Sequence, residues 1–179
     1  MKKSRNLQTL IVRRKPGQNR AAGILTFGDQ SIECRLGKTG ITAIKREGDG
    51  ATPRGKFQIL DGFFRRDRQK RPHSTIRLKQ ITTKMGWCDA PENANYNALV
   101  KLPFLPSHET MTRDDRLYNV CLVLDYNIKP VQRHFGSAIF FHLTSETNKG
   151  TQGCVAISPA AMRKLLPRLS LKTFVDIRL

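Results

Sequence analysis

The chain has few acidic residues. Its 179 residues include 14 Asp and Glu against 32 Lys and Arg, a formal net charge of +18. Such an excess attracts polyanions and carboxylate-bearing molecules. Aromatic residues make up only 7% of the chain, and they form no run of alternating basic and aromatic residues that would stack a single strand. Nucleic-acid binding is therefore an alternative that only the charge supports, and we expect no specific nucleic-acid partner.

Cysteine is also scarce, and none of the four cysteines belongs to a CxxC pair. They are Cys34, Cys88, Cys121 and Cys154. Their spacings fit no zinc module. We therefore expect neither a metal nor a cofactor, and the cytoplasmic location argued below predicts reduced thiols.

Long apolar runs are missing too. No stretch approaches the ~20 apolar residues of a membrane span, and only residues 10–12 are apolar between two basic clusters near the N-terminus. A signal peptide needs an apolar region of ~7–15 residues. The sequence thus predicts a cytoplasmic protein without a membrane span, or a periplasmic one if an upstream signal has been removed.

What is present predicts one all-β domain. Residues 1–20 carry seven basic and no acidic residues, so we treat them as a basic arm and 21–179 as the folded domain. Short alternating or apolar runs punctuated by Gly, Pro and Asp are typical of strands. The expected strands are 7–13, 22–27, 31–36, 41–45, 56–60, 74–78, 118–125, 138–143 and 174–179.

Three further segments stand out. Residues 120–124 are continuously apolar, which predicts a strand buried on both faces. Ser158 and Pro159 suit the start of one short helix over 160–169. The long region 82–117 carries no clear element, and a loop of that length in a compact domain is usually functional.

The sharpest chemical feature is Cys154 after Gly153, with His142 at the end of an apolar strand. A nucleophilic cysteine needs a base, backbone N–H groups for the oxyanion, and access. His142 could return beside Cys154 through the loop 144–150, and the N–H groups of Gly153 and Cys154 could form the oxyanion site. Free cysteines are often simply buried, so a core role for both residues is equally consistent. Cys88 is a weaker candidate nucleophile.

A second motif changes this balance. Thr52-Pro53-Arg54-Gly55-Lys56-Phe57, together with His142 and Thr151-Gln152-Gly153-Cys154, resembles the L,D-transpeptidase (YkuD-like) catalytic domain, in its short single-domain bacterial branch. The resemblance implies a β-sandwich or barrel with one short C-terminal helix before the last strand. It also implies that Cys154 is the nucleophile and His142 the proton acceptor and donor.

The resemblance further implies a substrate. The cysteine of the family attacks the carbonyl of the third residue, usually meso-diaminopimelate, of peptidoglycan stem tetrapeptides and releases D-Ala. Thr151, Gln152, Arg54 and His108 are the expected substrate-binding residues. Many members carry His where this chain has Gln152 and Arg where it has Ala156. Arg54, Lys84 or Arg113 would then hold the substrate carboxylates.

The acceptor remains open at this stage. Without a signal sequence the substrates would be soluble muropeptides, and water would outcompete amines. The sequence therefore favours L,D-carboxypeptidase activity, with amine-dependent cross-linking as the alternative and a catalytically dead muropeptide-binding module as a distant one. Carbapenems are expected covalent inhibitors. An imidazolium close to Cys154 would lower the pKa of its thiol.

Overall fold

The computed structural model describes residues 7–144 and 150–179, and most of its regular structure is β-sheet. Its main sheet has nine strands among these residues. They are β1 (Thr9–Arg14), β2 (Ala22–Phe27), β3 (Gln30–Arg35), β6 (Gly55–Phe64), β7 (Lys79–Gln80), β11 (Val120–Leu124), β12 (Phe140–Leu143), β13 (Val155–Ile157) and β14 (Phe174–Ile177). The order is β11-β12-β13-β3-β2-β1-β14-β6-β7, and a further β11–β6 pairing closes the sheet like a barrel. The expected all-β fold is confirmed.

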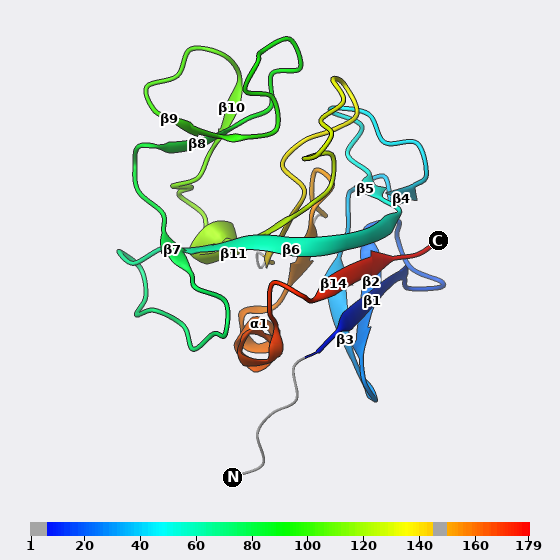
Figure 1. Ribbon diagram of the computed structural model, residues 1–179. Helices are drawn as coiled ribbons and strands as arrows, with labels where there is room; N and C mark the ends of the chain where they lie inside the picture. Colours follow the sequence, from blue (N-terminus) through cyan, green and yellow to red (C-terminus); the bar gives the residue numbers. More distant parts are fainter. Residues whose placement is uncertain (1–6, 145–149) are drawn as a thin grey trace.

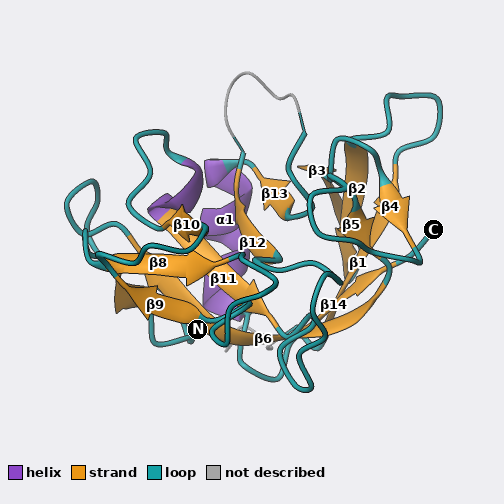
Figure 2. Cartoon of the chain, turned by 90° about the horizontal axis from the view of Figure 1, so that it is seen from above, coloured by secondary structure: helices purple, strands orange, loops and turns teal. Residues whose placement is uncertain are grey.

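Two smaller sheets flank the barrel. β8 (Met85–Cys88), β9 (Leu99–Lys101) and β10 (His108–Thr110) form one, and β4 (Ile41–Thr42) pairs with β5 (Thr52–Pro53). The β8–β10 sheet and the β4–β5 pair lie at opposite ends of the molecule (Figure 1, Figure 2). The region 82–117, which showed no clear element in the sequence, therefore folds into a small sheet of its own.

The core forms where apolar strands meet inside the closed sheet. Every residue of β11 is buried, which confirms the expected doubly buried strand. Phe141, Val155 and Leu25 contribute to the larger cluster. A second cluster lies towards the β8–β10 sheet, where Trp87 and Tyr118 each contact the ring of Phe140 edge-on. Such edge-to-face pairs add ~0.5–1.5 kcal/mol beyond the buried area.

The ends of the chain meet in this sheet. β1 lies between β2 and β14 and pairs with β14 in parallel, with Leu10 opposite Val175. Leu10 and Val12 are fully buried. The basic N-terminal arm thus contributes an inner strand of the sheet, as its alternating segment 7–13 predicts.

The expected helix is present but shorter. α1 (Pro159–Leu165) begins after Ser158, whose side chain accepts the N–H of Ala161, and continues as the 3₁₀ turn η2 (Leu166–Arg168). A second 3₁₀ turn, η1 (Leu117–Asn119), leads into β11. Met162 and Leu165 fill the core from α1. The cap residue and the proline at the first helical position therefore predict the start of the helix correctly.

One strand prediction is wrong and another is too long, because side chains satisfy the backbone there. Residues 74–78 bury Ile76 and Leu78, but Ser74 accepts the N–H of Ile76 and Arg71 donates to the carbonyl of Leu78. The predicted strand 41–45 ends at Thr42, whose hydroxyl bonds both backbone groups of Ile44 and turns the chain.

Candidate active site

One cavity of about 420 Å³ is lined by both the candidate nucleophile and the candidate base. Cys154 lies just before β13, and His142 lies on the neighbouring parallel strand β12, opposite Ala156. Both side chains line the cavity, together with Thr151 and Gln152. Residues 145–149 of the loop that connects them lie outside the described residues.

His142 is 3% exposed and held in one tautomer. Its Nδ1 donates to the carbonyl of Leu143 at 2.7 Å, so Nε2 carries the lone pair that can accept a proton. The ring of Tyr118 packs edge-on at 5.3 Å. Burial lowers the pKa of His142 from 6.5 to about 4, so the resting imidazole is neutral.

Cys154 points at backbone in this structure. Its thiol donates to the carbonyl of Ala138 at 3.2 Å, and its Sγ accepts the N–H of Phe140 at 3.3 Å. Burial raises the pKa of the thiol to about 12. The expected lowering is therefore wrong for the resting site: desolvation disfavours the charged forms of both the thiol and the imidazole, so both groups stay neutral.

The turn before Cys154 is closed on itself. The N–H of Gly153 donates to Oγ1 of Thr151 at 3.1 Å, and the same hydroxyl donates to the carbonyl of Cys154 at 2.7 Å. Gly153 does not line the cavity. A Cβ on Gly153, whose φ is +137°, would stand 2.8 Å from the carbonyl oxygen of Ala51. The glycine thus allows this turn to pack against the residue before Thr52.

The two sequence motifs come together at Thr52, the first residue of β5. Thr52 is fully buried, and its Oγ1 accepts the N–H of Gly37 at 2.7 Å. Gly37 pairs with Thr151, whose carbonyl accepts the N–H of Lys38 at 2.9 Å. Hydrogen bonds donated by Gly37 and Lys38 therefore join the first motif to the turn before Cys154.

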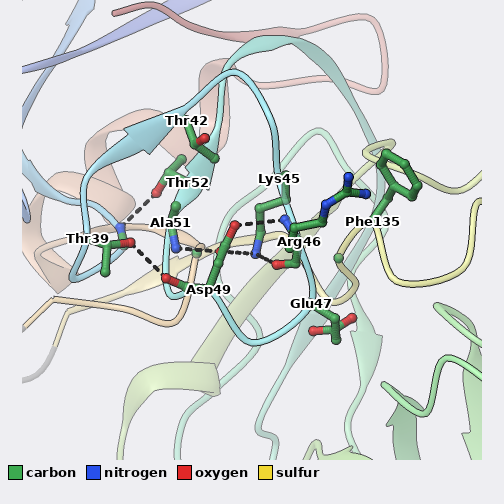
Figure 3. Close-up of polar contacts among 12 residues, drawn as sticks. Thr39, Thr42, Lys45, Arg46, Glu47, Asp49, Ala51, Thr52 and Phe135 are labelled. Atoms are coloured by element: carbon green, nitrogen blue, oxygen red, sulfur yellow. Dashed lines mark hydrogen bonds and ion pairs between the residues drawn. The ribbon is translucent and has the colours of Figure 1, made fainter.

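The loop between β4 and β5 forms one wall of the cavity through Glu47 and Gly48. Asp49 holds this loop: its carboxylate accepts from Lys45 at 2.5 Å and from the N–H groups of Arg46 and Ala51 at 2.8 Å each (Figure 3). Burial opposes the ionised form of Asp49, but these bonds outweigh it and lower its pKa. The hydrogen bonds that Asp49 accepts thus hold the loop between β4 and β5 in one conformation.

Two guanidinium groups line the cavity. Arg35 on β3 lies directly opposite Ala156 in the sheet, so its side chain projects from the same face. Arg113 follows the β8–β10 sheet and pairs with Glu109 and Asp115. The sequence suggested Arg113, but Arg35 could be found only from the pairing of β3 with β13.

Other candidates lie outside the cavity. Arg54 is exposed between β5 and β6. His108 on β10 donates from Nδ1 to the carbonyl of Pro106 at 2.8 Å and contacts the ring of Phe104. Cys88 is fully buried and does not line the cavity.

Sequence reasoning missed Asn97, which is 4% exposed between β8 and β9. Its Oδ1 accepts from the indole of Trp87 at 2.9 Å and from the N–H of Ala138 at 3.0 Å. Its Nδ2 donates to the carbonyls of Tyr126 and Asn127. No local pattern marks this residue, because all four partners are distant in sequence.

Residues 7–144 and 150–179 contain no group of three or more His, Cys, Asp or Glu that could hold a metal ion. The same residues include no helix of the length and apolarity needed to cross a membrane. The described residues that line the cavity provide a thiol, an imidazole, carboxylates and guanidinium groups.

A closed all-β barrel with a cysteine and a histidine in one cavity is the arrangement implied by the motif resemblance. The family model of the L,D-transpeptidase catalytic domain (YkuD) matches residues 10–177. The chain therefore belongs to this family of enzymes, which acts on peptidoglycan peptides. No curated protein matches the chain significantly.

Proposed function

We propose that the protein is a cysteine acyl-transfer enzyme that cleaves the bond between diaminopimelate and D-Ala in stem tetrapeptides. The observation that carries the proposal is the placement of Cys154 just before β13 and of His142 on the neighbouring strand β12, where both line one cavity. A free, buried thiol with a neutral histidine in the same cavity can act as nucleophile and base.

The thiol leaves the Ala138 carbonyl as substrate enters. Sγ of Cys154 attacks the carbonyl of the third residue while Nε2 of His142 accepts the thiol proton. The tetrahedral oxyanion is stabilised by the N–H of Cys154, and by that of Gly153 once it leaves Thr151. Collapse breaks the amide bond, and His142 returns the proton to the departing D-Ala amine, which leaves a thioester.

Arg35 and Arg113 bind the carboxylates of the substrate. Guanidinium groups suit this role because they form paired hydrogen bonds with a carboxylate. The position of Arg35 opposite Ala156 supports it as the replacement for the arginine that many family members carry at that position. Thr151 and Gln152 line the same cavity and bind the peptide beside the cysteine.

Water resolves the thioester, so the enzyme trims soluble tetrapeptides to tripeptides. Water is present at far higher concentration than dissolved amines, and it therefore reacts first unless the closed site excludes it. A periplasmic or cytoplasmic location would change the substrate pool but not these residues.

The proposal is tested by mass spectrometry of the intact protein after mixing with a carbapenem. We expect one covalent adduct that is absent in Cys154→Ala and retained in Cys88→Ala. The same proteins are then incubated with disaccharide tetrapeptide. Tripeptide and D-Ala support hydrolysis, cross-linked dimers indicate an amine acceptor, and absence of both adduct and product from the wild type overturns the enzyme assignment.

A further inference from the structure

Glu47 places a carboxylate in the wall of the cavity, on the loop fixed by Asp49. Its Oε2 accepts hydrogen bonds from the hydroxyl of Tyr96 at 2.5 Å and from Oγ of Ser137 at 2.7 Å. Its backbone N–H donates to the carbonyl of His134 at 2.8 Å. Three contacts from two other segments therefore fix the position of this carboxylate.

In the part of the chain that the structure describes, this carboxylate has no cationic partner. Among the described residues, Glu47 forms no ion pair with Lys, Arg or His, whereas Glu109 in the same cavity pairs with Arg113. Burial and the neighbouring carboxylate raise the pKa of Tyr96, so its hydroxyl stays protonated and donates to Glu47. In a chain with a net charge of +18, a carboxylate that no described cation pairs with, in the cavity of the candidate nucleophile, is available for a cationic group of a ligand.

Glu47 lies close to the position of the acyl group. Ser137, its hydrogen-bond donor, precedes Ala138, whose carbonyl holds the Cys154 thiol at 3.2 Å. The hydrogen-bond donor to Glu47 and the acceptor of the Cys154 thiol are therefore consecutive residues, so an acyl group on Cys154 occupies the same cavity as this carboxylate. Arg35 and Arg113 line the same cavity, so the cavity carries both positively and negatively charged groups.

We propose that Glu47 binds a protonated amine on the side chain of the substrate's third residue. The inference rests on the proposed function and deepens it. The enzyme then selects a side chain that carries both an ammonium and a carboxylate, with Glu47 binding the first and the arginines the second. The positive charge of the whole chain disfavours simple cations, and this local carboxylate confines amine binding to molecules that also carry carboxylates.

The test measures binding in a background that cannot turn over. Cys154→Ala protein is titrated calorimetrically with disaccharide tetrapeptide whose side-chain amine is free, and with the same compound after acetylation of that amine. A charged hydrogen bond contributes ~1.5–3 kcal/mol, which corresponds to about 10- to 100-fold in affinity. We expect a preference of that size for the free amine, and we expect Glu47→Gln in the same background to abolish it.

Glu92→Gln is the charge-matched control. Glu92 pairs with His134 outside the cavity, and its side chain is 75% exposed. This variant should keep the full preference for the free amine. An equal affinity for both compounds, or a preference that survives Glu47→Gln, overturns the inference. A wild type that binds with this preference but yields no acyl-enzyme or product overturns the proposed function alone.

Discussion

Asn97 accepts the N–H of Ala138 at 3.0 Å, and the carbonyl of the same Ala138 accepts the Cys154 thiol at 3.2 Å. Ala138 has a φ of 51°, in the left-handed region, which costs an L-residue about 1–2 kcal/mol. One buried amide thus holds the strained residue that orients the candidate nucleophile. The segment between β8 and β9 acts on the site through this contact.

Asn97→Ala should lower kcat by tenfold or more while KM changes little, because the thiol loses its fixed carbonyl partner. It should also reduce the free energy of unfolding by about 2 kcal/mol or more, since buried partners lose their bonds. Asn127→Ala is the matched control: Asn97 and Asn127 have similar positive φ values, 59° and 51°, but the amide of Asn127 donates to Gln132 and Gly136, whereas that of Asn97 accepts the N–H of Ala138. Equal kcat values for the two variants would contradict the positioning role.

Cys154→Ala should abolish turnover and leave the fold intact, because the loss of one thiol opens only a small cavity. The fold is checked by circular dichroism and thermal unfolding, and activity by release of D-Ala. Wild-type activity in Cys154→Ala would contradict the assignment of Cys154 as the nucleophile.

His142→Ala should reduce the rate of D-Ala release by ~10²–10⁴, the usual contribution of a general base. A reduction of only twofold would contradict the assignment of His142 as the base.

Alkylation of Cys154 in the free enzyme should be slow at neutral pH. Because burial raises the pKa of the thiol to about 12, the iodoacetamide rate should still be rising well above the ~8.5 of an unperturbed cysteine. Peptide mapping separates Cys154 from Cys34, Cys88 and Cys121, which are also buried and free. A plateau reached below neutral pH would indicate a thiolate–imidazolium pair instead.

Acid should destabilise the protein through His142. The pKa of this residue falls from 6.5 in the unfolded chain to about 4 in the fold, so the unfolded state binds the proton first as the pH falls. The stability that comes from keeping His142 neutral is fully present above about pH 6.5 and is lost as the pH falls to about 4. Urea unfolding at these two pH values should show that the free energy of unfolding decreases by roughly 3 kcal/mol more in the wild type than in His142→Gln. Equal losses would show that His142 is charged or accessible in the folded protein.

Gly153→Ala should destabilise the protein and abolish activity. The added methyl group meets the Ala51 carbonyl at 2.8 Å, and the φ of +137° disfavours any side chain; strain of this kind costs ~1–3 kcal/mol. Gly17→Ala is the control, because Gly17 also has a positive φ but has nothing within 4 Å of a built Cβ. The midpoint temperature of thermal unfolding should therefore decrease more in Gly153→Ala than in Gly17→Ala.

The sequence alone determined the features that depend on neighbours along the chain. Alternation of apolar and polar residues predicted the long strands, the apolar run 120–124 predicted a fully buried one, and Ser158 with Pro159 predicted the helix start. The motifs around Thr52 and Cys154 indicate the family from local sequence alone, and the family model confirms it. These signals are local, so they survive without tertiary information.

Only the tertiary structure decided the features that depend on pairing and burial. The register of β13 against β3 places Arg35 opposite Ala156, and no sequence pattern specifies a pairing between strands so far apart. The expected strand 74–78 failed because side chains satisfied its backbone in place of a neighbouring strand. The thiol pKa of Cys154 rises because burial removes water from Cys154 and His142, and the extent of burial is a property of the whole fold.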